Sequence, residues 1–275
     1  MIIDVIDHLT MRHEEQADSD SDKPGHDKLD RACLFGDGFF TTGIIVNNCF
    51  RYQNNHMARL LESAKKLRFD GFSVSGLKQC IAKISEQNAN ASIRISISRR
   101  QSQRGYSISK QAQYYCTIHL SELKDAPDVP CELIDATISV SYNKDLAGIK
   151  HLNRLDSVLA ASEISNKNQE VLMYHDHQVI CGSRSNLFVK LNDEWLTPSL
   201  DGAGVKGITR QRVLDVFSEK KIKHQITSIT REQLAQVSAA FVTNSLIGVW
   251  SAKSLNGCTL DVEDSDQLKK LITRK

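Results

Sequence analysis

LAGIKHLNRLDSVLAASE, residues 146–163, is the most informative segment of this 275-residue chain. Its second part predicts a helix, with Leu152, Leu155, Leu159 and Ala160 at helical spacing on one side. Lys150 lies between a predicted strand and this helix. A lysine at such a junction is usually a solvated surface residue, because lysine is rarely buried. Any chemical role for Lys150 therefore depends on the motifs that surround it.

The residues that follow this segment predict more strands than helices. Alternating apolar and β-branched residues predict strands over residues 170–182, 185–191 and 194–198, with a turn at Asn192–Asp193. Residues 239–250 predict a buried strand followed by a loop. Residues 131–142, which precede it, are also mostly strand-like. Helical periodicity predicts a helix over 207–222 and a short surface helix over 264–275.

The first part of the chain shows the same mixture of elements. Residues 39–52 predict a hairpin that turns at Asn47–Asn48. Residues 56–69 predict a helix, and residues 91–100 and 114–120 predict strands. The densely charged segment 11–30 predicts a loop.

Residues 121–130, SELKDAPDVP, contain two of the four prolines and are the best candidate for a linker. We therefore expect a small N-terminal α/β domain at residues 1–121. A larger C-terminal domain at residues 122–275 would carry Lys150. The mixture of helices with mostly antiparallel strands predicts the α+β class.

Composition excludes several classes of protein. Lys+Arg 35 against Asp+Glu 33 leaves a net charge of +2, which disfavours binding to nucleic acid. No apolar run approaches the length of a membrane span, and residues 1–10 do not have the pattern of a secretory signal. The seven scattered cysteines include no C-x-x-C pair, which indicates reduced thiols in a cytoplasmic protein rather than a disulfide framework or a zinc site.

Several motifs in order along the chain resemble those of fold type IV pyridoxal-phosphate enzymes, a group that includes D-amino-acid and branched-chain aminotransferases. The lysine segment, with His151, Asn153 and Arg154 after Lys150, looks like that of 4-amino-4-deoxychorismate lyases in particular. The other matching motifs are RACLFGDGFFTTGII (31–45), HMARLLESAKKL (56–67), ISRRQSQRGYS (97–107), GSRSNLF (182–188), LDGAGVKGITR (200–210) and TNSLIGV (243–249). The resemblance covers about residues 30 to 250 and implies a two-domain fold with pyridoxal 5'-phosphate as cofactor.

The resemblance also implies roles for individual residues. Lys150 would hold the cofactor and then move protons at the substrate, and Thr42 aligns best with a catalytic threonine. Arg104 and Tyr106 lie on a loop that faces substrate in relatives. For Thr42 and Arg104, a structural strand residue and a solvated loop arginine remain open alternatives. We interpret Asp37 as a turn residue and His151 as a core or surface histidine.

Residues 200–210 match the segment that binds the cofactor's phosphate in relatives. Gly207 precedes a predicted helix, so the backbone N–H groups of Ile208 and Thr209 would point out of its N-terminus, where anions bind. Arg59 would add a charge-assisted contact, and Ser245 is a further candidate by resemblance. For Arg59 a solvated helix position is the alternative.

Cys181 departs from the family pattern. Relatives usually have a glutamate there that pairs with the pyridine nitrogen, and a thiol is a weaker hydrogen-bond partner. We interpret this as a reaction that needs less of an electron sink than transamination does. The expected reaction is elimination of pyruvate from 4-amino-4-deoxychorismate to give 4-aminobenzoate, a step of folate biosynthesis.

Two other interpretations remain open. One is a D-amino-acid or branched-chain aminotransferase, against which stand Cys181, the sequence KHLNR and Phe40 in place of a tyrosine that D-amino-acid aminotransferases usually have. The other is a catalytically degenerate protein of the same fold that retains the dimer and binds a ligand or a partner. Fold type IV enzymes are typically homodimers, so the resemblance implies a homodimer that acts on a small-molecule substrate.

Overall fold

The computed structural model describes residues 2–7, 31–99, 105–108 and 114–273. Two compact units divide the chain. Unit 1 comprises residues 1–124 together with 150–153, and unit 2 comprises residues 125–149 and 154–275. The predicted loop at 11–30 lies outside the described residues. No helix within the described ranges is long and apolar enough to cross a membrane.

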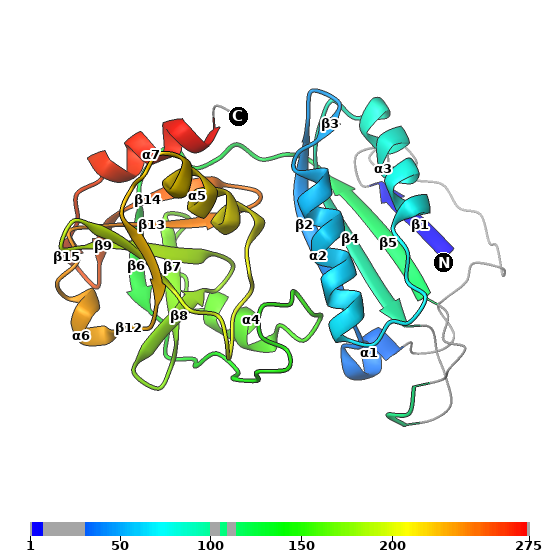
Figure 1. Ribbon diagram of the computed structural model, residues 1–275, viewed down its shortest axis with the longest axis horizontal. Coiled ribbons are helices and arrows are strands. Elements are labelled where there is room, and N and C mark those ends of the chain that lie inside the picture. The colour runs from blue at the N-terminus through cyan, green and yellow to red at the C-terminus, as the bar shows by residue number, and fades with distance from the viewer. Residues whose placement is uncertain (1, 8–30, 100–104, 109–113, 274–275) are drawn as a thin grey trace. The chain divides into compact units, whose positions relative to one another are not determined.

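Unit 1 is a five-stranded sheet in the order β1-β5-β4-β2-β3 with two helices, α2 and α3, packed on it (Figure 1). The strands are β1 (Ile2–Asp7), β2 (Gly38–Val46), β3 (Cys49–Phe50), β4 (Asn90–Arg99) and β5 (Tyr114–Ser121). The helices are α1 (Arg31–Phe35), α2 (Gln53–Lys66) and α3 (Ser75–Gln87). Only the β1–β5 pair is parallel.

Strict alternation gives the unit 1 sheet one apolar face and one polar face. In β4 the isoleucines at 93, 95 and 97 are fully buried, whereas Arg94 between them is exposed. The apolar face packs against Met57 and Leu60 of α2 and against Leu77, Ile81 and Ile84 of α3. The predicted hairpin is confirmed, since Asn47 and Asn48 have φ of 51° and 59°, as a two-residue turn of this type requires.

Unit 2 is built on a ten-stranded sheet. Its main path runs in the order β11-β10-β9-β13-β14-β6-β7-β8-β12, and β15 pairs with β14. The strands are β6 (Cys131–Asp135), β7 (Gln169–His175), β8 (Gln178–Gly182), β9 (Asn186–Leu191), β10 (Glu194–Pro198), β11 (His224–Thr227), β12 (Ile229–Thr230), β13 (Ala239–Asn244), β14 (Gly248–Leu255) and β15 (Cys258–Thr259). β8 also contacts β9 and β10, so the sheet curls back on itself.

Four helices accompany this sheet: α4 (Leu155–Ala161), α5 (Ile208–Glu219), α6 (Arg231–Leu234) and α7 (Glu263–Thr273). The helices α5 and α7 cover one face of it, where Phe188, Phe217 and Phe241 form part of an aromatic core. Inside the curl, Leu133, Leu187 and Trp250 belong to a second core.

Two local expectations were wrong, and one helix was missed. The strand predicted over 131–142 ends at Asp135. The helix predicted from Leu152 begins only at Leu155, and Leu155 and Leu159 are exposed rather than buried on a common side. The helix α3 was not predicted at all, although Leu77, Ile81 and Ile84 have helical spacing.

Lys150 also groups differently from the expectation that a second domain would carry it. Lys150–Asn153 belongs to unit 1, because the backbone of these residues bonds to β2. The chain therefore passes from unit 2 to unit 1 after Ile149 and belongs to unit 2 again from Arg154.

Candidate active site

The backbone of Lys150 is fixed by pairing with the start of β2. The N–H of Phe40 donates to the Lys150 carbonyl at 2.9 Å, and the N–H of Leu152 donates to the Gly38 carbonyl at 3.0 Å. This pairing needs space beside Gly38, where a Cβ atom would lie 2.4 Å from the Ile97 carbonyl oxygen and 2.7 Å from Leu152 Cδ1. The glycine-rich opening motif and the lysine segment, more than a hundred residues apart, thus form one local structure.

The side chain of Lys150 lies against the polar face of the unit 1 sheet. Its Nζ is 4.6 Å from the centroid of the Phe40 ring. Thr42, two residues further along β2, presents its side chain on the same face because side chains alternate along a strand. The structure thus brings Lys150 and Thr42, the two predicted catalytic residues, to one face of one strand.

Arg59 lies on α2, half-buried, one turn after His56. Burial lowers the pKa of Arg59 to about 10, and Glu62 opposes that shift. His56 Nδ1 lies 2.6 Å from Thr41 Oγ1, and the imidazole stacks on Phe50. Burial, helped by Arg59, lowers the pKa of His56 to about 3, so this histidine is neutral at physiological pH. No role was predicted for His56, although it lies inside the quoted helix motif.

Tyr106 projects from a loop that Arg31 holds. The buried Arg31 guanidinium donates from Nη1 to the carbonyls of Gly105 (3.0 Å) and Ser107 (3.2 Å) and from Nη2 to that of Tyr106 (3.3 Å). The Tyr106 side chain is 84% exposed and contacts the Phe35 ring at a centroid distance of 5.0 Å. Arg104, the other predicted substrate residue, lies outside the described residues.

Asp37 is more than the turn residue we expected. Its carboxylate accepts from Arg31 Nε and from Arg99 Nη1, both at 2.7 Å. Arg99 Nη2 donates further to the carbonyls of Leu67 and Arg68 at 2.6 Å. Asp37 therefore ties the glycine-rich motif to the end of α2 and, through Arg31, to the loop that bears Tyr106.

In unit 2, Gly207 precedes α5 and no side chain caps that helix. The first N–H groups of the helix, on the buried residues Ile208 and Thr209, have no carbonyl one turn earlier in the helix. A Cβ atom on Gly207 would lie 2.0 Å from Asn186 Oδ1, so only glycine fits here. Asn186 in turn donates to the Val205 carbonyl at 2.9 Å and holds the preceding loop.

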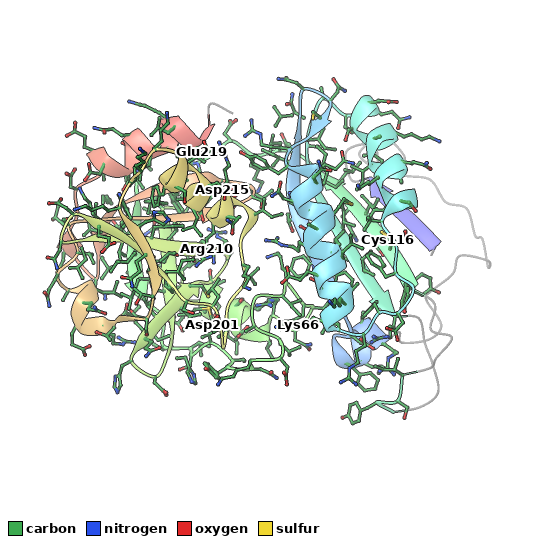
Figure 2. All side chains as sticks on the ribbon, in the orientation of Figure 1. Lys66, Cys116, Asp201, Arg210, Asp215 and Glu219 are labelled. Atoms are coloured by element: carbon green, nitrogen blue, oxygen red, sulfur yellow. The ribbon has the colours of Figure 1, made fainter. Side chains whose placement is uncertain are left out.

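Arg210, labelled in Figure 2 on α5, fastens the first turn of this helix to β10. Its buried guanidinium donates from Nη2 to the Pro198 carbonyl at 3.1 Å and from Nε to Thr197 Oγ1 at 3.3 Å. Burial lowers the pKa of Arg210 to about 10, and Asp201, also labelled in Figure 2, opposes that shift. The orientation of the helix N-terminus is therefore fixed by a charged group that stays protonated.

Thr243 adds a feature that the sequence did not reveal. It pairs with Asn186 across β13 and β9, so its side chain lies on the same face as the Asn186 amide beside Gly207. Thr243 Oγ1 is buried and has no hydrogen-bond partner among the described residues. Ser245, the predicted ligand, lies half-buried two residues later in the turn after β13. An uncapped helix N-terminus, a glycine that leaves room beside Asn186 and an unsatisfied hydroxyl fit a phosphate group.

Cys181 lies on β8, 9% exposed, in an apolar cluster with Met173 and Ala203. The nearby Arg154, which donates to the Ile149 carbonyl at 2.7 Å, has a pKa lowered by burial, with Asp156 and Cys181 opposing that shift. The buried Glu170 does not replace the missing carboxylate. Its carboxylate accepts hydrogen bonds from the N–H and hydroxyl of Ser183 and from Ser185 Oγ, and these bonds stabilise the 183–185 turn.

Comparison with known proteins places these features in a family. The family model for class IV aminotransferases matches residues 38–255, and this chain belongs to that family. The fold is that of fold type IV enzymes, as expected, and pyridoxal 5'-phosphate is their cofactor.

Individual relatives include more than one activity. The chain is 26% identical to the aminodeoxychorismate lyase of Vibrio harveyi over 229 residues, which are 80% of this chain and 83% of that one. It is 23% identical to the D-alanine aminotransferase of Bacillus licheniformis over 235 residues, 84% and 83% of the two chains. The solved 4-amino-4-deoxychorismate lyase from Pseudomonas aeruginosa is similar with a TM-score of 0.82 and 26% identity, covering 91% of this chain and 96% of that one.

Proposed function

We propose that this protein is a pyridoxal-phosphate-dependent lyase that converts 4-amino-4-deoxychorismate into 4-aminobenzoate and pyruvate. The observation that favours a lyase over an aminotransferase is Cys181, a thiol in an apolar cluster where the family usually has a carboxylate. An elimination that ends in an aromatic ring needs less stabilisation of negative charge than a transamination does. The likeness to two lyases at 26% identity supports the same choice.

Lys150 would hold the cofactor through its amine. The N–H groups of Ile208 and Thr209, with Arg59 and Ser245, would bind its phosphate, and Cys181 would lie at its ring nitrogen. When bound, the cofactor supplies an electron sink for charge that develops at the amine-bearing carbon of the substrate.

Lys150 is the group that moves the proton. Its neutral amine takes the proton from C4 of the substrate, and the bond between C3 and the enol-ether oxygen breaks. Lys150 then returns the proton to the departing enolpyruvate, which becomes pyruvate, and the ring is left as 4-aminobenzoate. The hydroxyl of Thr42, on the same strand face, assists this transfer, while Tyr106 and Arg104 contact the substrate carboxylates.

The test is an assay of the protein loaded with cofactor. We expect equal amounts of 4-aminobenzoate and pyruvate from 4-amino-4-deoxychorismate, and no product with Lys150→Ala. Absence of both products from a loaded wild-type protein would reject the lyase.

An aminotransferase is the second candidate, because the relatives include D-alanine aminotransferases over 84% of this chain. Transfer of the amino group from D-alanine or leucine to 2-oxoglutarate, at a rate above that of 4-aminobenzoate formation, would favour it. A protein that binds the cofactor but performs neither reaction would be a ligand-binding member of the family.

A further inference from the structure

Two cationic side chains share the ring of Phe40. Arg94 Cζ lies 3.7 Å from the ring centroid and Lys150 Nζ lies 4.6 Å from it. Arg94 is also paired with Thr42 across β2 and β4, so its side chain shares the polar face with that hydroxyl. Arg94 was not among the residues singled out by the sequence, because it lies inside an alternating strand.

The strand that carries Arg94 and the two strands beside it have no negative charge to compensate it. None of the residues of β2, β4 and β5 is an aspartate or a glutamate. In the part of the chain that the structure describes, Arg94 forms no ion pair, and its side-chain hydrogen bond is from Nε to Ser96 Oγ at 3.2 Å. Across the sheet it pairs with His119 rather than with an acid. Asp37, which directly precedes β2, is already bound by Arg31 and Arg99.

The stacked geometry leaves Arg94 ready to bind an anion. A guanidinium that lies over an aromatic ring uses its flat face for that contact, and its N–H groups remain available in the plane. With Nε directed to Ser96, the two terminal nitrogens remain for a bidentate contact with a carboxylate. Because both distances are measured from the centroid of the Phe40 ring, the separation between Arg94 Cζ and Lys150 Nζ is at most the sum of the two. Both cationic groups are therefore within reach of one ligand bound beside Phe40.

We propose that Arg94 binds the ring carboxylate of the substrate, the one that is retained in 4-aminobenzoate and lies opposite the amine. This inference rests on the proposed function. It assigns the two ends of the ring to Lys150 and Arg94, whose side chains both contact the ring of Phe40. Tyr106 and Arg104 are then left for the enolpyruvyl carboxylate.

The test uses cofactor-loaded protein and two ligands that differ only in charge, 4-aminobenzoate and 4-aminobenzamide. Affinities are measured by calorimetric titration, without turnover. Arg94→Gln should weaken 4-aminobenzoate binding by about 10- to 100-fold, the usual range for losing a charge-assisted hydrogen bond, and leave 4-aminobenzamide binding unchanged. Arg94→Lys should recover part of the loss. Arg68→Gln, which removes an exposed arginine just after α2, is the matched control and should change neither affinity.

Turnover provides a second measurement. Arg94→Gln should raise KM for 4-amino-4-deoxychorismate more than it lowers kcat. Equal losses for both ligands, or unchanged binding of 4-aminobenzoate, would overturn the assignment of Arg94. A wild-type protein that forms no 4-aminobenzoate would instead reject the proposed function, and the titrations would still decide whether Arg94 binds the carboxylate.

Discussion

At the scale of single residues, the proposed reaction depends most directly on the chemistry of Cys181. Its thiol lies near the guanidinium of Arg154, whose pKa it helps to hold up. A glutamate introduced there would be expected to pair with a protonated ring nitrogen and to strengthen the electron sink. The structure thus gives a direct way to test whether this chain's reaction depends on that sink.

We predict that Cys181→Glu changes lyase turnover by less than a hundredfold, because formation of the aromatic ring already drives the elimination. The same variant should speed the transfer of the amino group from D-alanine. Initial rates of 4-aminobenzoate and pyruvate formation measure both reactions, and Cys181→Ser is the control of similar size. A hundredfold or greater rise in lyase turnover would contradict this explanation of the thiol.

His56 predicts a dependence of stability on pH. Its pKa is lowered from 6.5 to about 3 in the folded state, because burial disfavours the imidazolium. Above pH 6.5 the histidine is neutral in both the folded and the unfolded state, so it does not make the free energy of unfolding depend on pH. As the pH falls from 6.5 towards 3, only the unfolded chain takes up the proton, so His56 destabilises the fold by up to about 1.4 kcal/mol per pH unit.

His56→Gln should remove this contribution while an amide can still bond to Thr41 Oγ1. Urea unfolding at pH 7 and pH 5 measures the free energy of unfolding of each variant. The wild type should lose more stability than His56→Gln between these two pH values. Equal losses in the two proteins would contradict the neutral, buried state of His56.

At the scale of elements, the N-terminus of α5 depends on Gly207 for space. The φ of Gly207 is −65°, which any residue can adopt, so the glycine is required by the Asn186 amide and not by the backbone. We predict that Gly207→Ala weakens cofactor binding at least about tenfold, because displacing Asn186 releases the Val205 loop. Titration of the apoprotein with pyridoxal 5'-phosphate, followed by absorbance, measures the affinity.

Gly76, in the first turn of α3, is the matched control. A Cβ atom there would meet nothing within 4 Å. Gly76→Ala should therefore keep the cofactor affinity and raise stability by about 0.5–1 kcal/mol, as expected for glycine replaced within a helix. Equal cofactor affinities for Gly207→Ala and Gly76→Ala would show that the N-terminus of α5 does not hold the phosphate.

At the scale of the whole molecule, α4 presents an apolar surface. The side chains of Leu155, Val158 and Leu159 are 70%, 62% and 46% exposed. We predict a homodimer that buries this surface, because exposed apolar clusters of this kind favour association. Sedimentation should give twice the mass of the chain, and Val158→Asp should lower it to one chain. Val129→Asp, at an exposed valine outside α4, should remain dimeric, and a monomeric wild type would contradict the prediction.

The sequence by itself determined the elements whose periodicity is local. The β2–β3 turn at Asn47–Asn48 and the helix α5 follow from residues close together in the chain. The ordered motifs indicated the fold and the cofactor, both of which the family comparison supports. These features need only short-range rules of backbone conformation and side-chain alternation.

The tertiary structure alone decided where distant residues meet. Lys150–Leu152 is not the start of a helix, because its N–H and carbonyl groups bond to Gly38 and Phe40 of β2. Asp37 is an ion-pair centre because Arg99 reaches it from 62 residues away. Arg94 joins Lys150 because both lie on the ring of Phe40. No local pattern encodes these meetings, since each depends on which strands pair and in which register.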